Sequence, residues 1–190
     1  MEFTKYFTTE NTVLHETENF IVIPSLGSFV IGYVLVIPKN KILSYSELDV
    51  SYYSELSNLS RYLVSHIEKH CGRVVCFEHG PSVPESTLGC GIDYAHLHVV
   101  PTDCPVKLTL EKKFSFVKFE IQSNWKQFEN KDYLYLNEND QDYFADISGE
   151  NIVSGLIRKT IAEFENHHHR HDWRQHRFED NIKKTIELFN

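Results

Sequence analysis

The stretch "DYAHLHVVPT", residues 93–102, places two histidines one residue apart in an otherwise apolar, β-forming run. Successive side chains of a strand point to opposite faces, so His96 and His98 share one face. The alternation assigns the neighbouring side chains as well: Tyr94 and Val100 lie beside the histidines, and Ala95, Leu97 and Val99 lie opposite. We therefore predict a strand at about 92–100 that buries its apolar face in a core.

The histidine pair fits three kinds of site. The first is a structural pair of half-exposed histidines on a sheet. The second is a metal site, in which His96 and His98 are joined by His79 or Glu78. The third is a nucleophilic imidazole with a partner side chain. The spacing alone leaves all three open.

The composition is that of an ordinary globular domain, with 41% hydrophobic and 24% charged residues among 190. No apolar run has the length of a membrane span, and the first residues lack the pattern of a signal peptide. The four cysteines form no C-x-x-C pair, so we expect free thiols, no zinc knuckle and a cytoplasmic location. The net charge of −8 argues against duplex nucleic acid as a partner, although local donors can still bind a small anion.

The first hundred residues predict strands at about 19–24, 29–38 and 73–80, and one long helix within 48–73. Leucine and isoleucine recur at helical spacing in that helix. Asp49 or Ser51 can cap its start, and Gly72 can end it. A loop rich in Gly, Pro and Ser, residues 81–91, leads into the histidine strand.

The composition changes after Pro101. Residues 107–122 alternate and predict a strand, and 132–147 predict a hairpin with its turn at 137–141. An amphipathic helix is expected within 148–165, capped by Ser148 or Asn151, and a short last helix at 178–189. The tract that contains His167, His168, His169 and His171 predicts a solvated loop able to bind metal adventitiously. Strands and helices follow one another without regular βαβ units, which predicts an α+β fold with an antiparallel sheet.

The order of these elements, together with two short motifs, resembles the histidine triad (HIT) superfamily of nucleotide hydrolases and transferases. The family motif is His-φ-His-φ-His-φ-φ, where φ is apolar, and residues 94–100 match it except that Tyr94 replaces the first histidine. The stretch "GYVLVIP", residues 32–38, resembles the family's Gly-His-φ-Leu-Val-φ-Pro element, with Tyr33 at the histidine position. The resemblance covers roughly residues 12–102. The later segments "YLYL", "YF", "DWR" and "NI" resemble the C-terminal extension of a bacterial branch of HIT-like proteins.

The resemblance implies a HIT-like nucleotide-binding domain at 1–108, with an antiparallel sheet of about five strands and one long helix. An extension at 109–190, formed by a hairpin and helices, would pack on the same domain. The family's chemistry implies that His96 attacks the α-phosphorus of a nucleotide and forms a covalent nucleotidyl-histidine. The backbone carbonyl of Tyr94 would orient His96, and His98 would donate to the phosphate or the leaving group. No metal or other cofactor is expected.

The resemblance also assigns residues to the ligand, which would be a nucleotide or a nucleotide conjugate. The expected nucleotide-binding residues are Ile23, Ser25 and Leu26 for the base and ribose, Glu78, and Gly89 and Gly91 for the phosphates. Many relatives are homodimers, so we expect a homodimer with the helix at about 50–71, or its adjoining strand, near the two-fold axis. Because Tyr33 and Tyr94 replace family histidines, a non-catalytic nucleotide-binding module stays open, as does the metal enzyme.

Overall fold

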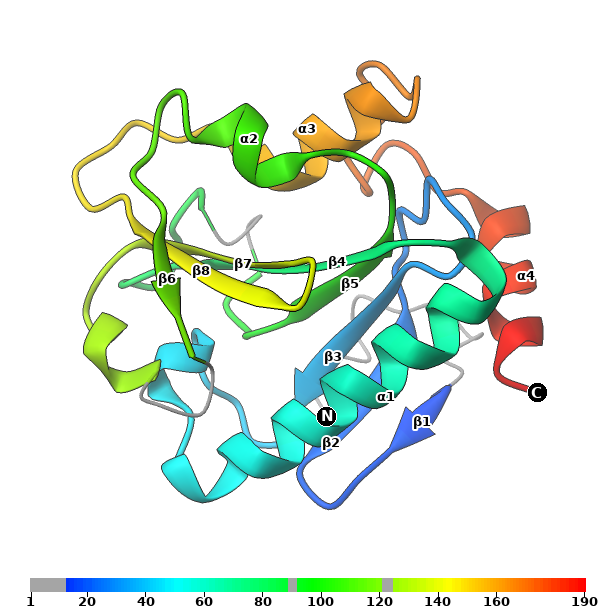
Figure 1. Cartoon of the computed structure of the whole chain (residues 1–190), viewed down its shortest axis with the longest axis horizontal. Helices are drawn as coiled ribbons and strands as arrows, with labels where there is room; N and C mark the ends of the chain where they lie inside the picture. Colours follow the sequence, from blue (N-terminus) through cyan, green and yellow to red (C-terminus); the bar gives the residue numbers. More distant parts are fainter. Residues whose placement is uncertain (1–12, 89–91, 121–124) are drawn as a thin grey trace.

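A computed structural model of the chain describes residues 13–88, 92–120 and 125–190. Its sheet has eight strands in the order β1-β2-β3-β5-β4-β7-β8-β6, and every neighbouring pair is antiparallel (Figure 1). The strands are β1 (His15–Glu16), β2 (Phe20–Pro24), β3 (Val34–Pro38), β4 (Val74–Gly80), β5 (Leu97–Pro101), β6 (Val117–Phe119), β7 (Tyr133–Glu138) and β8 (Gln141–Asp146). The expected α+β class with an antiparallel sheet is confirmed. The expected number of about five strands is wrong, because β6, β7 and β8 continue the same sheet beyond β4.

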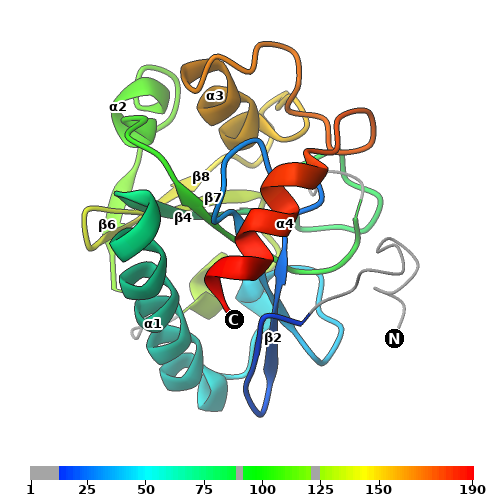
Figure 2. The same cartoon turned by 90° about the vertical axis from the view of Figure 1, so that its right-hand side faces the viewer.

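Helices cover both faces of this sheet (Figures 1 and 2). They are α1 (Tyr53–Cys71), α2 (Val106–Leu110), α3 (Leu156–Phe164) and α4 (Glu179–Leu188), with 3-10 turns at Tyr45–Glu47, Val50–Tyr52 and Trp125–Phe128. α1 packs on one face, and α2 and α3 pack on the other, so the sheet has a buried core on each side. The division follows the strand alternation, because neighbouring residues of β4 and β5 enter different cores.

The long helix α1 ends where the sequence indicated. Its apolar stripe is fully buried against the sheet and consists of Leu56, Leu59, Leu63 and Ile67. Each such side chain contributes roughly 1.5–3 kcal/mol when it leaves water. The Asp49 carboxylate accepts from the Ser51 amide in the 3-10 turn that leads into α1, and Gly72 ends the helix at a φ of +83°. α1 itself begins at Tyr53, because the residues before it form that 3-10 turn.

The hairpin of the second half is also confirmed. Glu138 pairs with Gln141, which leaves Asn139 and Asp140 as the two-residue turn. Both have positive φ, +55° and +57°. That combination defines a type I′ turn, whose twist suits adjacent strands and which Asn and Asp tolerate better than most residues.

The strand predicted at 107–122 is largely wrong. α2 occupies Val106–Leu110, and within the described part of that range, up to residue 120, the strand is limited to Val117–Phe119. Val106 and Leu110, four residues apart, are buried, while Leu108 between them is 59% exposed. The alternating sequence therefore also places apolar residues at helical spacing, and packing of these residues against the sheet favours the helix.

Three further boundaries differ from the prediction, each for a local backbone reason. The strand expected at 29–38 begins only at Val34, because Gly32 takes a φ of +85° that interrupts extended chain. The histidine strand begins at Leu97, since the Ala95 amide donates to the Ile42 carbonyl outside the sheet. α3 begins at Leu156 because Gly155 before it is left-handed, so neither Ser148 nor Asn151 is its cap. The last helix, α4, lies within the expected 178–189.

The second half of the chain is built into the sheet of the first half. β7 pairs along β4 through five residue pairs, from Cys76 with Asn137 to Gly80 with Tyr133. The boundary expected at 108 falls inside α2, and α2 and α3 cover the sheet face that carries the histidines. Residues of the extension therefore come within reach of the predicted site.

Candidate functional site

His96 is held by the backbone contact that the sequence led us to expect. Its Nδ1 lies 2.8 Å from the carbonyl oxygen of Tyr94. A carbonyl only accepts, so Nδ1 carries the proton and Nε2 keeps its lone pair. Burial lowers the pKa of His96 below its ordinary value, and the charge of Arg158 adds to this effect. His96 is therefore neutral at pH 7, with an unprotonated nitrogen.

His98 is held in the opposite tautomer. Its Nδ1 lies 2.6 Å from the Tyr33 hydroxyl, and that hydroxyl accepts from Arg158 Nη1 at 2.8 Å. Arginine can only donate, so the Tyr33 oxygen accepts from Arg158, and we assign the hydroxyl hydrogen of Tyr33 to the contact with His98. Nδ1 of His98 then accepts and Nε2 carries the proton. Burial, His96 and Arg158 together hold the pKa of His98 well below its ordinary value.

A third histidine, His79 on β4, lies beside this pair. Its ring centroid is 6.3 Å from that of His98, and the rings of His96 and His98 are 4.8 Å apart. Nε2 of His79 accepts from the Ile157 amide in the first turn of α3 at 3.1 Å, so Nδ1 carries the proton. Burial lowers the pKa of His79 to about 3. All three imidazoles are thus neutral.

Two of these rings present buried N–H groups without a partner. His98 Nε2 and His79 Nδ1 are inaccessible to solvent and have no hydrogen-bond acceptor among the described residues. Such groups are rare in folded proteins, since each costs about 1–3 kcal/mol. Phe77 stacks on the ring of His98 at 4.3 Å and 8°, which fixes the direction of its N–H. Two fixed donors and the lone pair of His96 suit an anionic group such as a phosphate.

The expected ligand residues of the first strands lie on the histidine side of the sheet. Ile23 on β2 is buried in the same core as Tyr94 and Leu35, and Leu35 pairs with His98. Ser25 accepts from Arg158 at 3.3 Å. Leu26 is half-buried in the following turn.

Glu78 lies away from the histidines. It points to the other face of β4, where its carboxylate accepts from the Tyr45 amide at 3.0 Å and from the Tyr133 hydroxyl. Burial raises the pKa of Glu78 to about 8. Gly89 and Gly91 lie outside the described residues, so their predicted role is not addressed by the structure.

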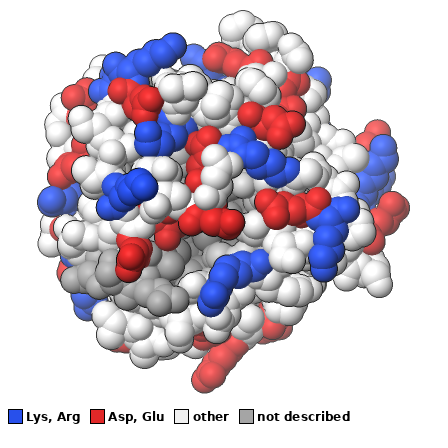
Figure 3. All heavy atoms as spheres, in the orientation of Figure 1, with Lys and Arg blue, Asp and Glu red and all other residues white. Residues whose placement is uncertain are grey.

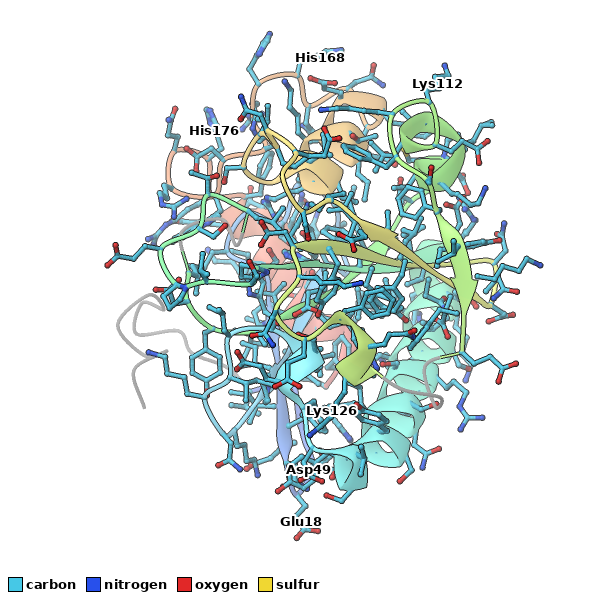
Figure 4. The ribbon with its side chains drawn as sticks, turned by 90° about the vertical axis from the view of Figure 1, so that its left-hand side faces the viewer. Glu18, Asp49, Lys112, Lys126, His168 and His176 are labelled. Carbon is cyan, nitrogen blue, oxygen red and sulfur yellow. The ribbon has the colours of Figure 1, made fainter. Side chains whose placement is uncertain are left out.

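A metal site at His96 and His98 would need a third ligand, and neither of the two predicted candidates is positioned to supply it. Glu78 is on the opposite face, and Nε2 of His79 is already used by the Ile157 amide. Across residues 13–88, 92–120 and 125–190, no three His, Cys, Asp or Glu side chains are grouped to hold a metal ion. In the histidine tract, His168 points outward at the surface, as does His176 beyond it (Figure 4).

Sequence reasoning missed Arg158 as a residue of this site. It lies on the buried face of α3 with Ile157, Ile161 and Ala162. A charged residue on an apolar helical stripe was the available signal, because burying a charge requires a compensating interaction. Tyr33 was noted only as a replaced histidine, and His79 only as a metal ligand.

The surface adds two observations on partners. On the face drawn in Figure 3, acidic and basic side chains are interspersed rather than gathered by sign. Within the described part of the chain, no helix has both the length and the apolar character needed to cross a membrane.

Comparison with known proteins gives structural neighbours only. No family model matches the sequence, and no curated protein matches it. One similar solved structure is a HIT-like protein involved in cell-cycle regulation from Bartonella henselae, with 14% identity, a TM-score of 0.42, and coverage of 52% of this chain and 72% of that one. Another is a hypothetical histidine triad nucleotide-binding protein from Sulfolobus tokodaii, with 23% identity, a TM-score of 0.41, and coverage of 53% and 64%. Both are named as HIT-like or histidine triad proteins.

Proposed function

We propose that this chain is a HIT-like nucleotide hydrolase or nucleotidyltransferase that acts through His96. The observation that carries the proposal is the 2.8 Å hydrogen bond from His96 Nδ1 to the Tyr94 carbonyl. It leaves Nε2 as a neutral nucleophile that needs no general base. The replacement of the first motif histidine by Tyr94 does not remove this support, since a main-chain carbonyl provides it.

In the first step, His96 Nε2 attacks the α-phosphorus, a P–N bond forms, and the bond from phosphorus to the leaving group breaks. His98 Nε2–H donates a hydrogen bond to a phosphate oxygen or to the leaving group and keeps its proton, while the leaving group takes up a proton from solvent as it departs. In the second step, water or another hydroxyl acceptor attacks phosphorus, the P–N bond breaks, and the acceptor releases one proton to solvent. The released nucleotide carries the acceptor oxygen, and His96 returns to its neutral state.

The test is His96→Ala, assayed on an adenosine phosphoramidate and on dinucleoside polyphosphates. We expect turnover to fall by about a thousandfold or more, as for loss of a nucleophile, while nucleotide binding persists. His168→Ala, at an exposed histidine, is the matched control and should keep native turnover. A His96→Ala protein with native turnover would contradict the assignment.

Two companion measurements separate the alternatives. Activity should survive EDTA, and loss of activity that zinc restores would favour the metal enzyme. A native protein that binds nucleotide but turns over none of these substrates would be a binding module instead. A nucleotide soaked into crystals should place its α-phosphorus about 3–3.5 Å from His96 Nε2.

The assembly and location follow from the same proposal. We expect a nucleotide or nucleotide conjugate as the ligand, a homodimer as the solution state, and the cytoplasm as the compartment. These three expectations do not require a basic protein surface, so they agree with the net charge of −8.

A further inference from the structure

Arg158 brings a buried positive charge into the site from the extension. Its side chain belongs to α3, and the residue is 3% exposed. Its guanidinium donates to Tyr33 and Ser25 hydroxyls through Nη1, to the Gly27 carbonyl through Nη2, and to the His171 carbonyl through Nε at 2.6 Å. Every one of these acceptors is neutral, and no described carboxylate forms a salt bridge with Arg158.

A guanidinium stays protonated at any pH a protein survives, so its buried charge is permanent. Burial without an opposite charge is costly, and neutral acceptors offset only part of that cost. Aromatic faces contribute as well, since the guanidinium carbon lies 5.1 Å from the Tyr33 ring centroid and 5.2 Å from that of Phe29. The charge of Arg158 therefore favours a negatively charged group close to the histidines.

We infer, on the basis of the proposed function, that Arg158 is a positioning residue: through the Tyr33 hydroxyl it holds His98 in the tautomer that offers Nε2–H to the substrate phosphate. The fixed order of donors runs from Arg158 Nη1 to the Tyr33 oxygen and from the Tyr33 hydroxyl to His98 Nδ1. Without Arg158, the Tyr33 hydroxyl is free to accept from His98 instead, and the proton of His98 then moves to Nδ1. The donor aimed at the phosphate would be lost.

The charge of Arg158 acts on the same histidines. The groups that face His98 are His96 from its own segment, His79 from β4, Tyr33 from the loop before β3, and Arg158 from α3. Arg158 lowers the pKa of each of the three histidines, after the larger effect of burial. Removing the charge should therefore raise these pKa values and move the acid limb of the pH–rate profile to higher pH.

The competing explanation is that Arg158 only ties α3 to the turn at 25–27. The experiment compares Arg158→Met, Arg158→Lys and Tyr33→Phe, with exposed Arg177→Met as the matched control. Tyr33→Phe and Arg158→Met should lower kcat by about tenfold to a hundredfold, with little change in KM for Tyr33→Phe. Arg158→Lys keeps the charge, so it should keep the native acid limb while recovering only part of kcat. The double variant Tyr33→Phe/Arg158→Met should lose no more kcat than the more affected single variant, because both residues act on His98 through the same hydrogen bonds.

NMR of the imidazole nitrogens supplies a readout that does not depend on turnover. We expect His98 with Nε2 protonated in the native protein and a shift towards Nδ1 protonation in Arg158→Met, where the Tyr33 hydroxyl can accept from His98. Should Arg158→Met fail to fold, Tyr33→Phe and Arg158→Lys carry the test. Native kcat in Tyr33→Phe, together with a native pH profile and an unchanged His98 tautomer in Arg158→Met, would overturn the inference and leave the role of His96 unaffected. Native turnover in His96→Ala would overturn the proposed function, while the tautomer measurement would still decide the role of Arg158.

Discussion

Glu78 is a carboxyl group buried on the side of the sheet away from the histidines. Its two acceptor contacts, to the Tyr45 amide and the Tyr133 hydroxyl, favour the charged form. Burial outweighs them and raises the pKa of Glu78 from 4.5 to about 8. Between pH 4.5 and about pH 8, Glu78 therefore binds a proton when the protein folds, so its ionisation makes the stability depend on pH.

The sign of that link gives a prediction for Glu78→Gln. A raised folded pKa contributes stability that is complete below the unfolded value of 4.5 and is lost as pH rises through about 8. Glutamine resembles the protonated acid, so the variant should lose less stability than the native protein between about pH 5 and pH 8. Urea unfolding at several pH values measures the difference. Parallel pH dependences in the two proteins would show that Glu78 is not the group responsible.

The backbone carbonyl and the side chain of Tyr94 have different roles. Its carbonyl accepts from His96, while its hydroxyl donates to the Pro38 carbonyl at 2.9 Å and the Lys39 carbonyl at 3.1 Å. Tyr94→Phe should cost about 1 kcal/mol of unfolding free energy and leave kcat within about tenfold of native. Chemical denaturation and the nucleotide assay check the two halves. A thousandfold fall in kcat of a folded variant would mean that the hydroxyl takes part in the chemistry.

At the scale of elements, the sequence pattern predicted a helix or a hairpin correctly where the pattern was long or included residues that favour one type of turn. α1 was predictable from its apolar stripe and Gly72, and the hairpin from Asn139 and Asp140. The short helix α2 and the start of α3 were not, because packing and a left-handed Gly155 decided them. A few residues of alternating sequence fit a helix and a strand almost equally well.

The candidate site also has one part that the sequence predicts and another that only the fold brings together. His96, His98 and the Tyr94 carbonyl lie within five consecutive residues, so strand spacing and the motif were enough to group them. Tyr33, by contrast, is 125 positions from its hydrogen-bonding partner Arg158. Such contacts exist only after the extension has folded over the sheet, and no local spacing encodes them.

The junction between β4 and β7 gives an element-scale prediction. Gly80 pairs with Tyr133, and a Cβ at Gly80 would overlap the tyrosine ring. Gly80→Ala should therefore lower the free energy of unfolding by about 1–3 kcal/mol, because the ring has to move. Chemical denaturation measures this change. Native stability would show that Tyr133 can give way and that the two strands dock loosely.

At the scale of the whole molecule, the expected homodimer stays a prediction that rests on α1. β4 is paired on both sides, and the strands at the two ends of the sheet, β1 and β6, have two and three residues. Such short edges offer little backbone for pairing between copies. The outer face of α1, where Tyr62 is 45% exposed, is where we expect the two-fold contact.

Light scattering at micromolar concentration measures the mass, and we expect twice that of the chain. Tyr62→Glu should shift the protein towards the monomer if α1 lies at the contact, because it places a charge in the interface. Glu163→Lys, at an exposed position of α3, is the control for a changed surface charge. A native mass of one chain would refute the dimer.

The pairing of β4 between β5 and β7 has a consequence during synthesis. β4 and β5 emerge from the ribosome before β7, so one edge of β4 stays open until Tyr133–Glu138 emerge. At roughly 5–20 residues per second, that interval lasts on the order of several seconds. An apolar strand with free amides and carbonyls is a site of aggregation. The nascent chain is thus most exposed to misassociation just before its extension is made, which is when we expect chaperones to bind it.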